Sequence, residues 1–210
     1  MGNDLNRTQA VFRDTNSAKV VEAILQIHFP GSPTIVDLTW GKGAFWGGSD
    51  RDVIGIDKAP RFGCQVKADA RYIPLQEQSV DVLIFDPPHI YSPGNITGMN
   101  LIGDYGSFET LEEAHMVYID AAQDIMLTAG QGSIIKCTDM VKHGRFVPTH
   151  AMVMAGLSPF LGWPADIAIL DSGVVRMQPW SQVKHLRHAH SYFLVYKNKE
   201  RDPRSSLAKL

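Results

Sequence analysis

The chain has 210 residues, of which 44% are hydrophobic and 20% are charged. This length fits one ordinary α/β domain, and the composition supports a hydrophobic core and excludes disorder of the whole chain. No apolar run approaches the roughly 20 residues of a membrane-spanning helix, and the start of the sequence lacks the pattern of a secretory signal. The two cysteines, Cys64 and Cys137, form neither a disulfide framework nor a Cys-x-x-Cys pattern. We therefore expect a cytoplasmic protein without membrane contact.

The formal net charge of −2 conceals an uneven distribution of charge along the chain. Residues 1–71 carry nine Lys/Arg and eight Asp/Glu, whereas residues 72–135 carry nine Asp/Glu and no Lys or Arg. Residues 136–210 carry eleven Lys/Arg and five Asp/Glu. A polyanionic partner would therefore contact this last block. A solvated face without a partner is the alternative interpretation.

Short β-branched runs alternate with longer amphipathic stretches along the chain. In chain order, these patterns predict a helix over Ser17–Phe29, strands over Thr34–Leu38, Val53–Asp57 and Val80–Phe85, a helix over Leu111–Leu127, and strands over Gly132–Cys137, Ile167–Leu170 and Ser191–Tyr196. Apolar strands that alternate with helices indicate an α/β fold with a mostly parallel sheet and helices on both faces. We expect a single domain over residues 1–197, with a long loop at 90–105 and a polar tail at 198–210.

A glycine turn follows the first predicted β-strand. Asp37 stands at the end of this strand, and Gly41 and Gly43 form a Gly-x-Gly sequence after it. Such a turn lets a ligand approach the backbone closely. The third glycine of a dinucleotide-binding fingerprint is absent, because Trp46 occupies its position. A lone Gly-x-Gly is also common in purely structural turns, so it identifies no ligand by itself.

Two further acids follow the glycine turn. Asp57 ends the second predicted strand, twenty residues after Asp37. An acid at this position of a nucleotide-binding α/β fold accepts hydrogen bonds from ribose hydroxyls, although an isolated Asp can also cap a helix. Asp69 precedes the next strand, where it can bond an adenine amine or close a turn. The two strand-end acids and the glycine turn together favour an adenosine site.

The strongest pattern is Asp-Pro-Pro-His at residues 86–89, directly after the third predicted strand. Pro87 and Pro88 stiffen the chain and have no backbone N–H to donate. The Asp86 carboxylate and the Pro87 carbonyl can together accept both hydrogens of a primary amine, and His89 supplies a flat ring beside them. A Pro-Pro turn with only a structural role is the alternative interpretation.

This series of motifs resembles that of S-adenosylmethionine-dependent amino-methyltransferases, which methylate exocyclic amines of bases and carry Asp/Asn-Pro-Pro-aromatic. The resemblance covers roughly residues 10–197, and the segment 187–197 is similar to the final hairpin strand of DNA adenine-type members. It implies a Rossmann-like class I methyltransferase fold with a C-terminal antiparallel hairpin, and S-adenosylmethionine as cofactor. Two residues depart from the family pattern: His89 replaces Tyr, Phe or Trp, and Trp40 replaces a smaller residue.

The resemblance also implies roles for individual residues. The implied cofactor-binding residues are Asp37, Thr39, Trp40, Gly41, Gly43, Asp57, Lys58, Asp69 and Ala70. Among them, the turn from Asp37 to Gly43 would hold the methionine part, Asp57 the ribose, and Asp69 with Ala70 the adenine. The implied catalytic residues are Asp86, Pro87, Pro88 and His89, which would hold the target amine and stack on the base.

The chemistry of such a site depends on positioning. An exocyclic amine is a poor nucleophile because its lone pair is delocalised into the ring. Two acceptors on its hydrogens favour a pyramidal nitrogen, whose lone pair can face a methyl donor in line. No metal is needed, and the spacing His185-x-x-His188-x-His190 lacks nearby carboxylates that would favour one. A base in a duplex must first be flipped out or already be single-stranded.

The sequence therefore predicts methyl transfer to the 6-amino group of adenine in DNA. We expect Lys184, Arg187, Lys197 and Lys199 to contact phosphates. One alternative is methylation of an RNA base, adenine or guanine. Another is a non-catalytic subunit that binds cofactor or nucleic acid and supports a partner methyltransferase, although the intact Asp-Pro-Pro motif counts against it. Because a chain of this length has little surface for reading several base pairs, the alternatives are low sequence specificity or a helper protein for target recognition.

Overall fold

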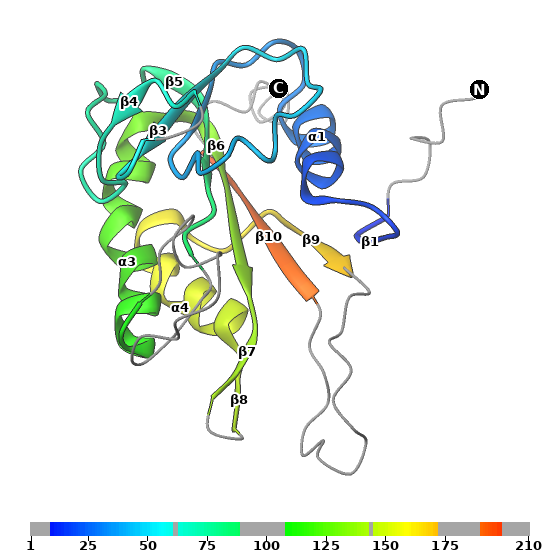
Figure 1. The fold of residues 1–210 in the computed structure, drawn as a ribbon, viewed down its shortest axis with the longest axis vertical. Helices are drawn as coiled ribbons and strands as arrows, with labels where there is room; N and C mark the ends of the chain where they lie inside the picture. Colours follow the sequence, from blue (N-terminus) through cyan, green and yellow to red (C-terminus); the bar gives the residue numbers. More distant parts are fainter. Residues whose placement is uncertain (1–8, 61–62, 89–107, 143–144, 172–189, 199–210) are drawn as a thin grey trace, which may run out of the picture.

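The computed structural model describes residues 9–60, 63–88, 108–142, 145–171 and 190–198. These residues form an eight-stranded sheet, covered by helices, and a separate two-stranded hairpin (Figure 1). The helices are α1 (Ser17–His28), α3 (Leu111–Thr128) and α4 (Thr149–Leu161). The strands are β1 (Val11–Arg13), β2 (Ile35–Asp37), β3 (Val53–Asp57), β4 (Val66–Lys67), β5 (Val80–Phe85), β6 (Ala129–Thr138), β7 (Met140–Lys142), β8 (Arg145–Val147), β9 (Asp166–Asp171) and β10 (His190–Lys197).

The large sheet is mostly parallel and has the order β1-β9-β10-β6-β5-β2-β3-β4. All its pairings are parallel except those of β10, which runs antiparallel to both β6 and β9. Since β10 follows β9 among the described strands, the two form the C-terminal antiparallel hairpin that the sequence predicted. The prediction of a Rossmann-like α/β fold is confirmed.

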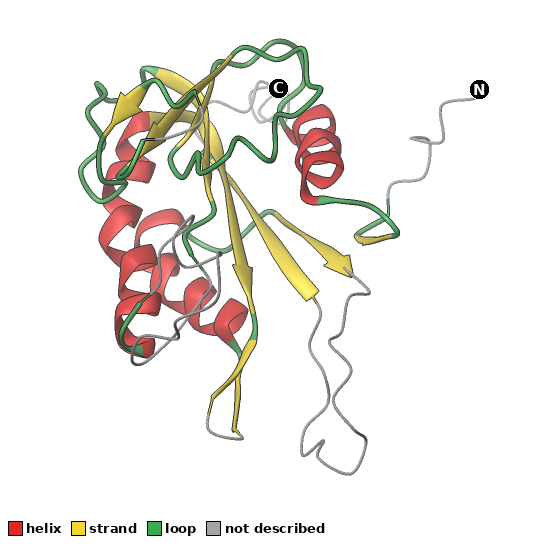
Figure 2. Ribbon diagram, in the orientation of Figure 1, coloured by secondary structure: helices red, strands yellow, loops and turns green. Residues whose placement is uncertain are grey.

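Helices cover both faces of this sheet, as predicted (Figure 2). On one face, α1 packs Leu25 into the core cluster that contains Ile84 of β5. On the other face, α3 and α4 contribute Ile125 and Leu157 to the cluster that contains Leu83. The alternation of side chains along β5 therefore supplies both cores, which explains why its sequence is apolar at every position except Asp81.

The sequence predicted two of the strands, β3 and β5, with their exact bounds, but it did not predict α4. Pro159 lies inside this helix and removes the N–H that would bond the Ala155 carbonyl. The Ser158 hydroxyl donates to that carbonyl instead, at 2.9 Å. A side chain thus replaces the missing backbone donor, and the helix continues through a residue that ordinarily ends one.

The strand order reverses around β2, which lies between β3 and β5. From β2 the chain adds β3 and β4 on one side, and it then crosses to add β5 and β6 on the other side. Open α/β sheets bind ligands outside the carboxyl ends of their strands at such a reversal. Asp37 ends β2, Asp57 ends β3 and Asp86 directly follows β5, so these three acids lie at this edge.

Several predicted features lie outside the described residues. They are His89, the loop 90–105, the possible metal ligands His185 and His188, the basic residues Lys184, Arg187 and Lys199, and the tail beyond residue 198. Within the described ranges, no helix combines the length and the apolar character that crossing a membrane requires.

Gly132 of β6 lies where the backbones of β6 and β10 approach each other closely. Its φ is 156°, and a Cβ there would overlap the backbone carbonyl of Tyr196. We expect Gly132→Ala to lower the free energy of unfolding by about 1–3 kcal/mol, because paired backbones must separate. Urea denaturation measures this loss. Gly47→Ala is the control, since a Cβ at Gly47 meets nothing within 4 Å. Equal losses in the two variants would contradict the prediction.

Candidate functional site

Asp37 organises the glycine turn that follows β2. Its side chain is buried; Oδ1 accepts the Thr39 backbone N–H at 3.0 Å, and Oδ2 accepts the Trp46 indole N–H at 2.8 Å. Trp46 takes the position of the missing third glycine, and its hydrogen bond ties the far part of the turn to the end of β2. The structure therefore gives Asp37 a supporting role in shaping the turn.

The carboxylates at this edge influence one another. Burial raises the pKa of Asp37 to about 6, although the hydrogen bonds from Trp46 and Thr39 oppose that increase. The negative charges of Asp86 and Asp57 raise the Asp37 pKa further. A cationic ligand would relieve this repulsion, so the cluster is electrostatically suited to positive charge.

Asp57 links the glycine turn to the end of β3. Its Oδ2 accepts the Gly41 backbone N–H and its Oδ1 accepts the Ala59 backbone N–H, both at 2.8 Å. A carboxylate oxygen can accept two hydrogen bonds. Asp57 can thus support the turn and still accept ligand hydroxyls, which is compatible with its predicted role.

The ring of Trp40 packs across two glycines. A Cβ at Gly43 would lie 3.0 Å from the ring, and a Cβ at Gly55 of β3 would overlap it. The Trp40 side chain also packs against the core cluster beneath α1. Because Gly43 and Gly55 have no side chains, the large ring of Trp40 fits at a position where the family pattern has a smaller residue.

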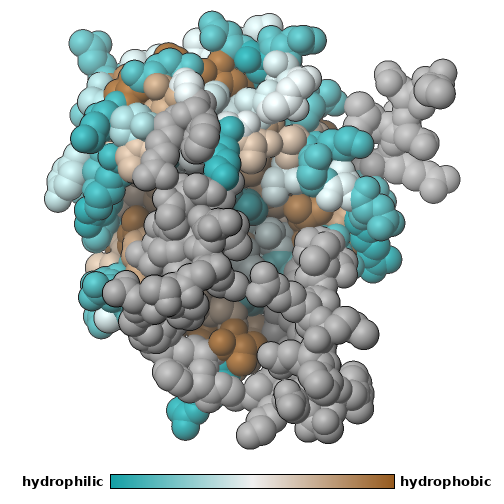
Figure 3. Space-filling view, in the orientation of Figure 1, coloured by the Kyte–Doolittle hydropathy of each residue, from teal (hydrophilic) through white to brown (hydrophobic). Residues whose placement is uncertain are grey.

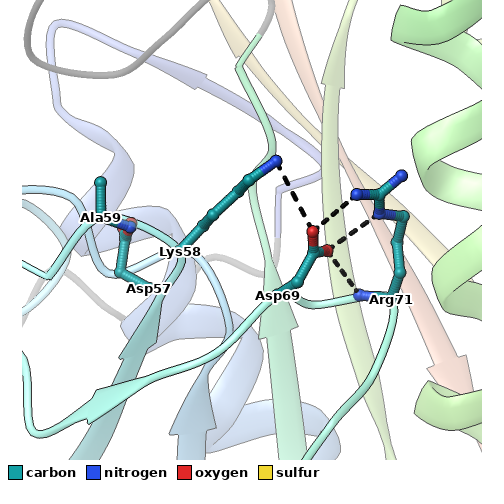
Figure 4. Close-up of polar contacts among 5 residues, drawn as sticks. All are labelled: Asp57, Lys58, Ala59, Asp69 and Arg71. Atoms are coloured by element: carbon teal, nitrogen blue, oxygen red, sulfur yellow. Dashed lines mark hydrogen bonds and ion pairs between the residues drawn. The ribbon is translucent and has the colours of Figure 1, made fainter.

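Asp69 forms an ion-pair group with Arg71 and Lys58 (Figure 4). Arg71 Nε and Nη2 donate to the two carboxylate oxygens at 2.9 and 2.6 Å, and Lys58 Nζ lies 3.7 Å from Oδ2. The side-chain hydrogen bonds from Arg71 hold the pKa of Asp69 at about 2. An adenine amine would therefore compete with Arg71 for Asp69. The neighbouring Ala70 is buried.

Asp86 forms an ion pair with Lys136 of β6. Lys136 Nζ donates to Asp86 Oδ2 at 2.8 Å, and the two side chains are only 14% and 18% exposed, respectively. The ammonium also lies 5.5 Å from the ring centroid of Phe45 and 5.8 Å from that of Phe193. The Asp86 backbone N–H donates to Thr39 Oγ1 at 2.7 Å. The carboxylate is thus fixed beside the glycine turn and already accepts a hydrogen bond from nitrogen.

Lys136 belongs to none of the sequence motifs. Its signal is a lysine inside the apolar run Gly132–Cys137, because lysine is almost never buried without a partner. The partner depends on strand register: Phe85 pairs with Ile135, which places Asp86 beside Lys136 on the adjacent strand.

A second polar group lies just beyond the end of β6. Asp139 is 5% exposed, accepts the backbone N–H of His150 at 3.1 Å, and lies 2.7 Å from His150 Nδ1. The His150 ring stacks on Tyr192 of β10, with ring centroids 4.2 Å apart. Asp139 therefore caps the start of α4 and orients the imidazole. The described part of the chain has no group of His, Cys, Asp and Glu that could hold a metal ion.

Lys197 lies at the opposite edge of the sheet. Because β10 is antiparallel, Lys197 pairs with Gly132 near the start of β6. Its Nζ donates to the His28 carbonyl at the end of α1, at 2.8 Å. The structure does not bring Lys197 together with Asp86, and its ammonium caps a helix. Lys197 therefore lies away from Asp86 in the sheet, and its contact with phosphates stays a prediction.

Solved structures share this fold, although no family model and no curated protein matches the sequence. The PH0226 protein from Pyrococcus horikoshii OT3 has a TM-score of 0.54 and 12% identity, over 92% of this chain and 93% of that one. TrmN from Thermus thermophilus has a TM-score of 0.53 and 14% identity, over 86% of this chain and 48% of TrmN, so the chain spans about half of that protein. A geranyl diphosphate methyltransferase solved with S-adenosylmethionine has a TM-score of 0.53 and 11% identity, over 86% of this chain and 84% of that one. The fold is therefore the Rossmann-like fold that methyltransferases share.

The raised pKa of Asp37 predicts a specific pH dependence of stability. A carboxyl group whose pKa rises on folding, from 3.8 to about 6, favours the folded state below pH 4 and loses that contribution as pH rises through 6. We expect the free energy of unfolding of the wild type, relative to Asp37→Asn, to fall by roughly 2 kcal/mol between pH 4 and pH 7. Urea denaturation of both proteins across this range measures the difference. A difference that does not change with pH would show that Asp37 titrates normally.

Proposed function

We propose that this protein transfers a methyl group from S-adenosylmethionine to an exocyclic amino group of a nucleic-acid base, with the 6-amino group of adenine in DNA as first candidate. One observation carries the proposal: Asp86, Pro87 and Pro88 follow β5 at the strand-order reversal, bonded to the glycine turn through Thr39. The methyltransferase-like fold supports the choice of cofactor. The choice of adenine in DNA rests on the sequence resemblance.

The residues of the edge fit this cofactor. Its methionine part carries a sulfonium and an ammonium group, which match the negative charges of Asp37, Asp57 and Asp86. Gly41 and Gly43 have positive φ values of 53° and 66°, a conformation that glycine adopts without steric cost. The second lone pairs of Asp57 would accept the ribose hydroxyls.

Asp86 and the Pro87 carbonyl would hold the target amine. The bound cofactor supplies a methyl group on a positively charged sulfur. The carboxylate would accept one N–H of the amine, as it now accepts an N–H of Lys136, and the Pro87 carbonyl would accept the other. Lys136 holds one carboxylate oxygen of Asp86 in place, and a carboxylate forms charge-assisted hydrogen bonds with nitrogen donors. The ion pair therefore prepares Asp86 to orient a nitrogen donor.

The cofactor role of Asp57 predicts a change in binding. We expect Asp57→Ala to weaken S-adenosylmethionine binding by about 1.5–3 kcal/mol, the scale of hydrogen bonds to a charged group. Isothermal calorimetry measures the affinity, and thermal unfolding checks that the variant folds without the bond to Gly41. Asp52→Ala, which removes an exposed acid just before β3, is the matched control. Unchanged affinity in folded Asp57→Ala would refute the ribose assignment.

The amine-holding role of Asp86 predicts a separation of binding from transfer. We expect Asp86→Asn to reduce methyl transfer at least 100-fold, since one well-placed electrostatic group contributes about 2.7–4 kcal/mol. Cofactor affinity should remain nearly intact. A tritiated-methyl assay with duplex DNA, single-stranded DNA and RNA, followed by nucleoside analysis, measures transfer. Asp120→Asn, an exposed position on α3, is the control.

The same assay separates the alternatives. Label in RNA alone would replace DNA as the substrate, and label in protein alone or nowhere would contradict the proposal. Wild-type protein that binds cofactor but labels no nucleic acid would support the non-catalytic subunit. Loss of cofactor binding in Asp86→Asn would place Asp86 in the cofactor pocket instead. A requirement for added cell extract would support the helper protein.

A further inference from the structure

The hairpin formed by β7 and β8 stands at the edge of the sheet that carries the candidate site. β7 begins two residues after β6 ends, and the hairpin projects beyond the end of β6 (Figure 1). Since β5 and β6 are parallel, their carboxyl ends share one edge. The hairpin therefore lies on the same side of the sheet as Asp86.

This hairpin concentrates positive charge. Lys142 of β7 and Arg145 of β8 are direct register partners, and residues 140–150 contain no Asp or Glu. Arg145 is exposed. A phosphate group at this hairpin would meet positive charge without a carboxylate from the same segment to repel it.

The base of the hairpin is held to the main sheet. Asp139 directly precedes β7, and His150 follows β8 after two intervening residues, Pro148 and Thr149. The contact between Asp139 and His150 Nδ1, at 2.7 Å, therefore joins the two legs of the hairpin. The stacking of His150 on Tyr192 connects these legs to β10. The hairpin is thus positioned relative to the candidate site before any partner binds.

An apolar pair accompanies the charges. Val141 and Phe146 are register partners, and each is 44% exposed. In the space-filling view, apolar atoms are visible at the lower end of the molecule, where Figure 1 places β7 and β8 (Figure 3). Successive side chains of a strand point to opposite faces, so Phe146 presents its ring on the face opposite to Arg145. An exposed aromatic ring can stack on a base of single-stranded nucleic acid.

We infer that the β7–β8 hairpin contacts the sugar-phosphate backbone of the nucleic acid beside the target base, with Lys142 and Arg145 binding phosphates. This inference rests on the proposed function and deepens it. It assigns phosphate binding to the edge that holds Asp86, whereas Lys197 lies at the opposite edge. An acidic protein would also match the charge, but the position beside the amine-holding residues favours the substrate's own backbone.

Salt-dependent binding tests the inference. The probes are a short fluorescent single-stranded DNA and its duplex, and anisotropy gives the affinity across a series of NaCl concentrations. We expect Lys142→Gln with Arg145→Gln to reduce the slope of log affinity against log salt by about 1.4–1.8, because each lost phosphate contact changes it by about 0.7–0.9. The control is Lys19→Gln with Lys67→Gln, which removes the same charge from exposed positions on α1 and β4. Its slope should equal that of the wild type.

The possible results separate this inference from the proposed function. An unchanged slope in the folded hairpin variant, with methyl transfer by the wild type, would overturn only the inference. A reduced slope without methyl transfer would support the hairpin surface and contradict the proposed function. Wild-type protein that binds neither DNA probe, or that binds poly-glutamate through the same two residues as tightly as DNA, would overturn nucleic acid as the partner. Thermal unfolding of each variant verifies the fold.

Discussion

The position of β2 between the parallel strands β3 and β5 is the constraint on which the candidate site depends. β2 pairs in parallel with both β3 and β5, so all three of its residues are buried, including Asp37. A buried carboxylate requires hydrogen-bond donors, and Thr39 and Trp46 supply them. These two bonds shape the glycine turn. The hydrogen bonds that the buried Asp37 carboxylate requires therefore also hold the glycine turn in its conformation.

Charge is divided along the carboxyl edge of the sheet. Asp37, Asp57 and Asp86 form an acidic part around β2, β3 and β5, whereas β7 and β8 bring Lys142 and Arg145 to the same side. A cationic cofactor and an anionic substrate would each meet the opposite charge. Lys136 lies at the junction and neutralises Asp86 where the two parts adjoin. The net charge of the chain is close to zero and by itself indicates no charged partner. The separation into an acidic and a basic part is what suits the two charged reactants of the proposed reaction.

The contacts of the site that the sequence did not predict have one feature in common: each joins residues that are not close in the sequence. Lys136 meets Asp86 across two paired strands, and Asp139 meets His150 across a hairpin. Each contact joins residues that local periodicity treats as unrelated. The helix α4, which presents His150, was itself missed because Pro159 ordinarily ends a helix, and the compensating Ser158 hydroxyl acts only once the helix exists.

The sequence by itself determined the parts that depend on neighbouring residues. The runs Val53–Asp57 and Val80–Phe85 form strands because β-branched side chains pack well on the pleated surface of a sheet, and these strands place Asp57 and Asp86 at their ends. Only the tertiary structure decided which strand ends meet, because strand order and register are set by non-local pairing. The antiparallel direction of β10 carries Lys197 to the far edge, and the register of β5 with β6 pairs Asp86 with a lysine fifty residues later. No local sequence pattern specifies these contacts, because side chains from distant segments become neighbours only when the strands pair into a sheet.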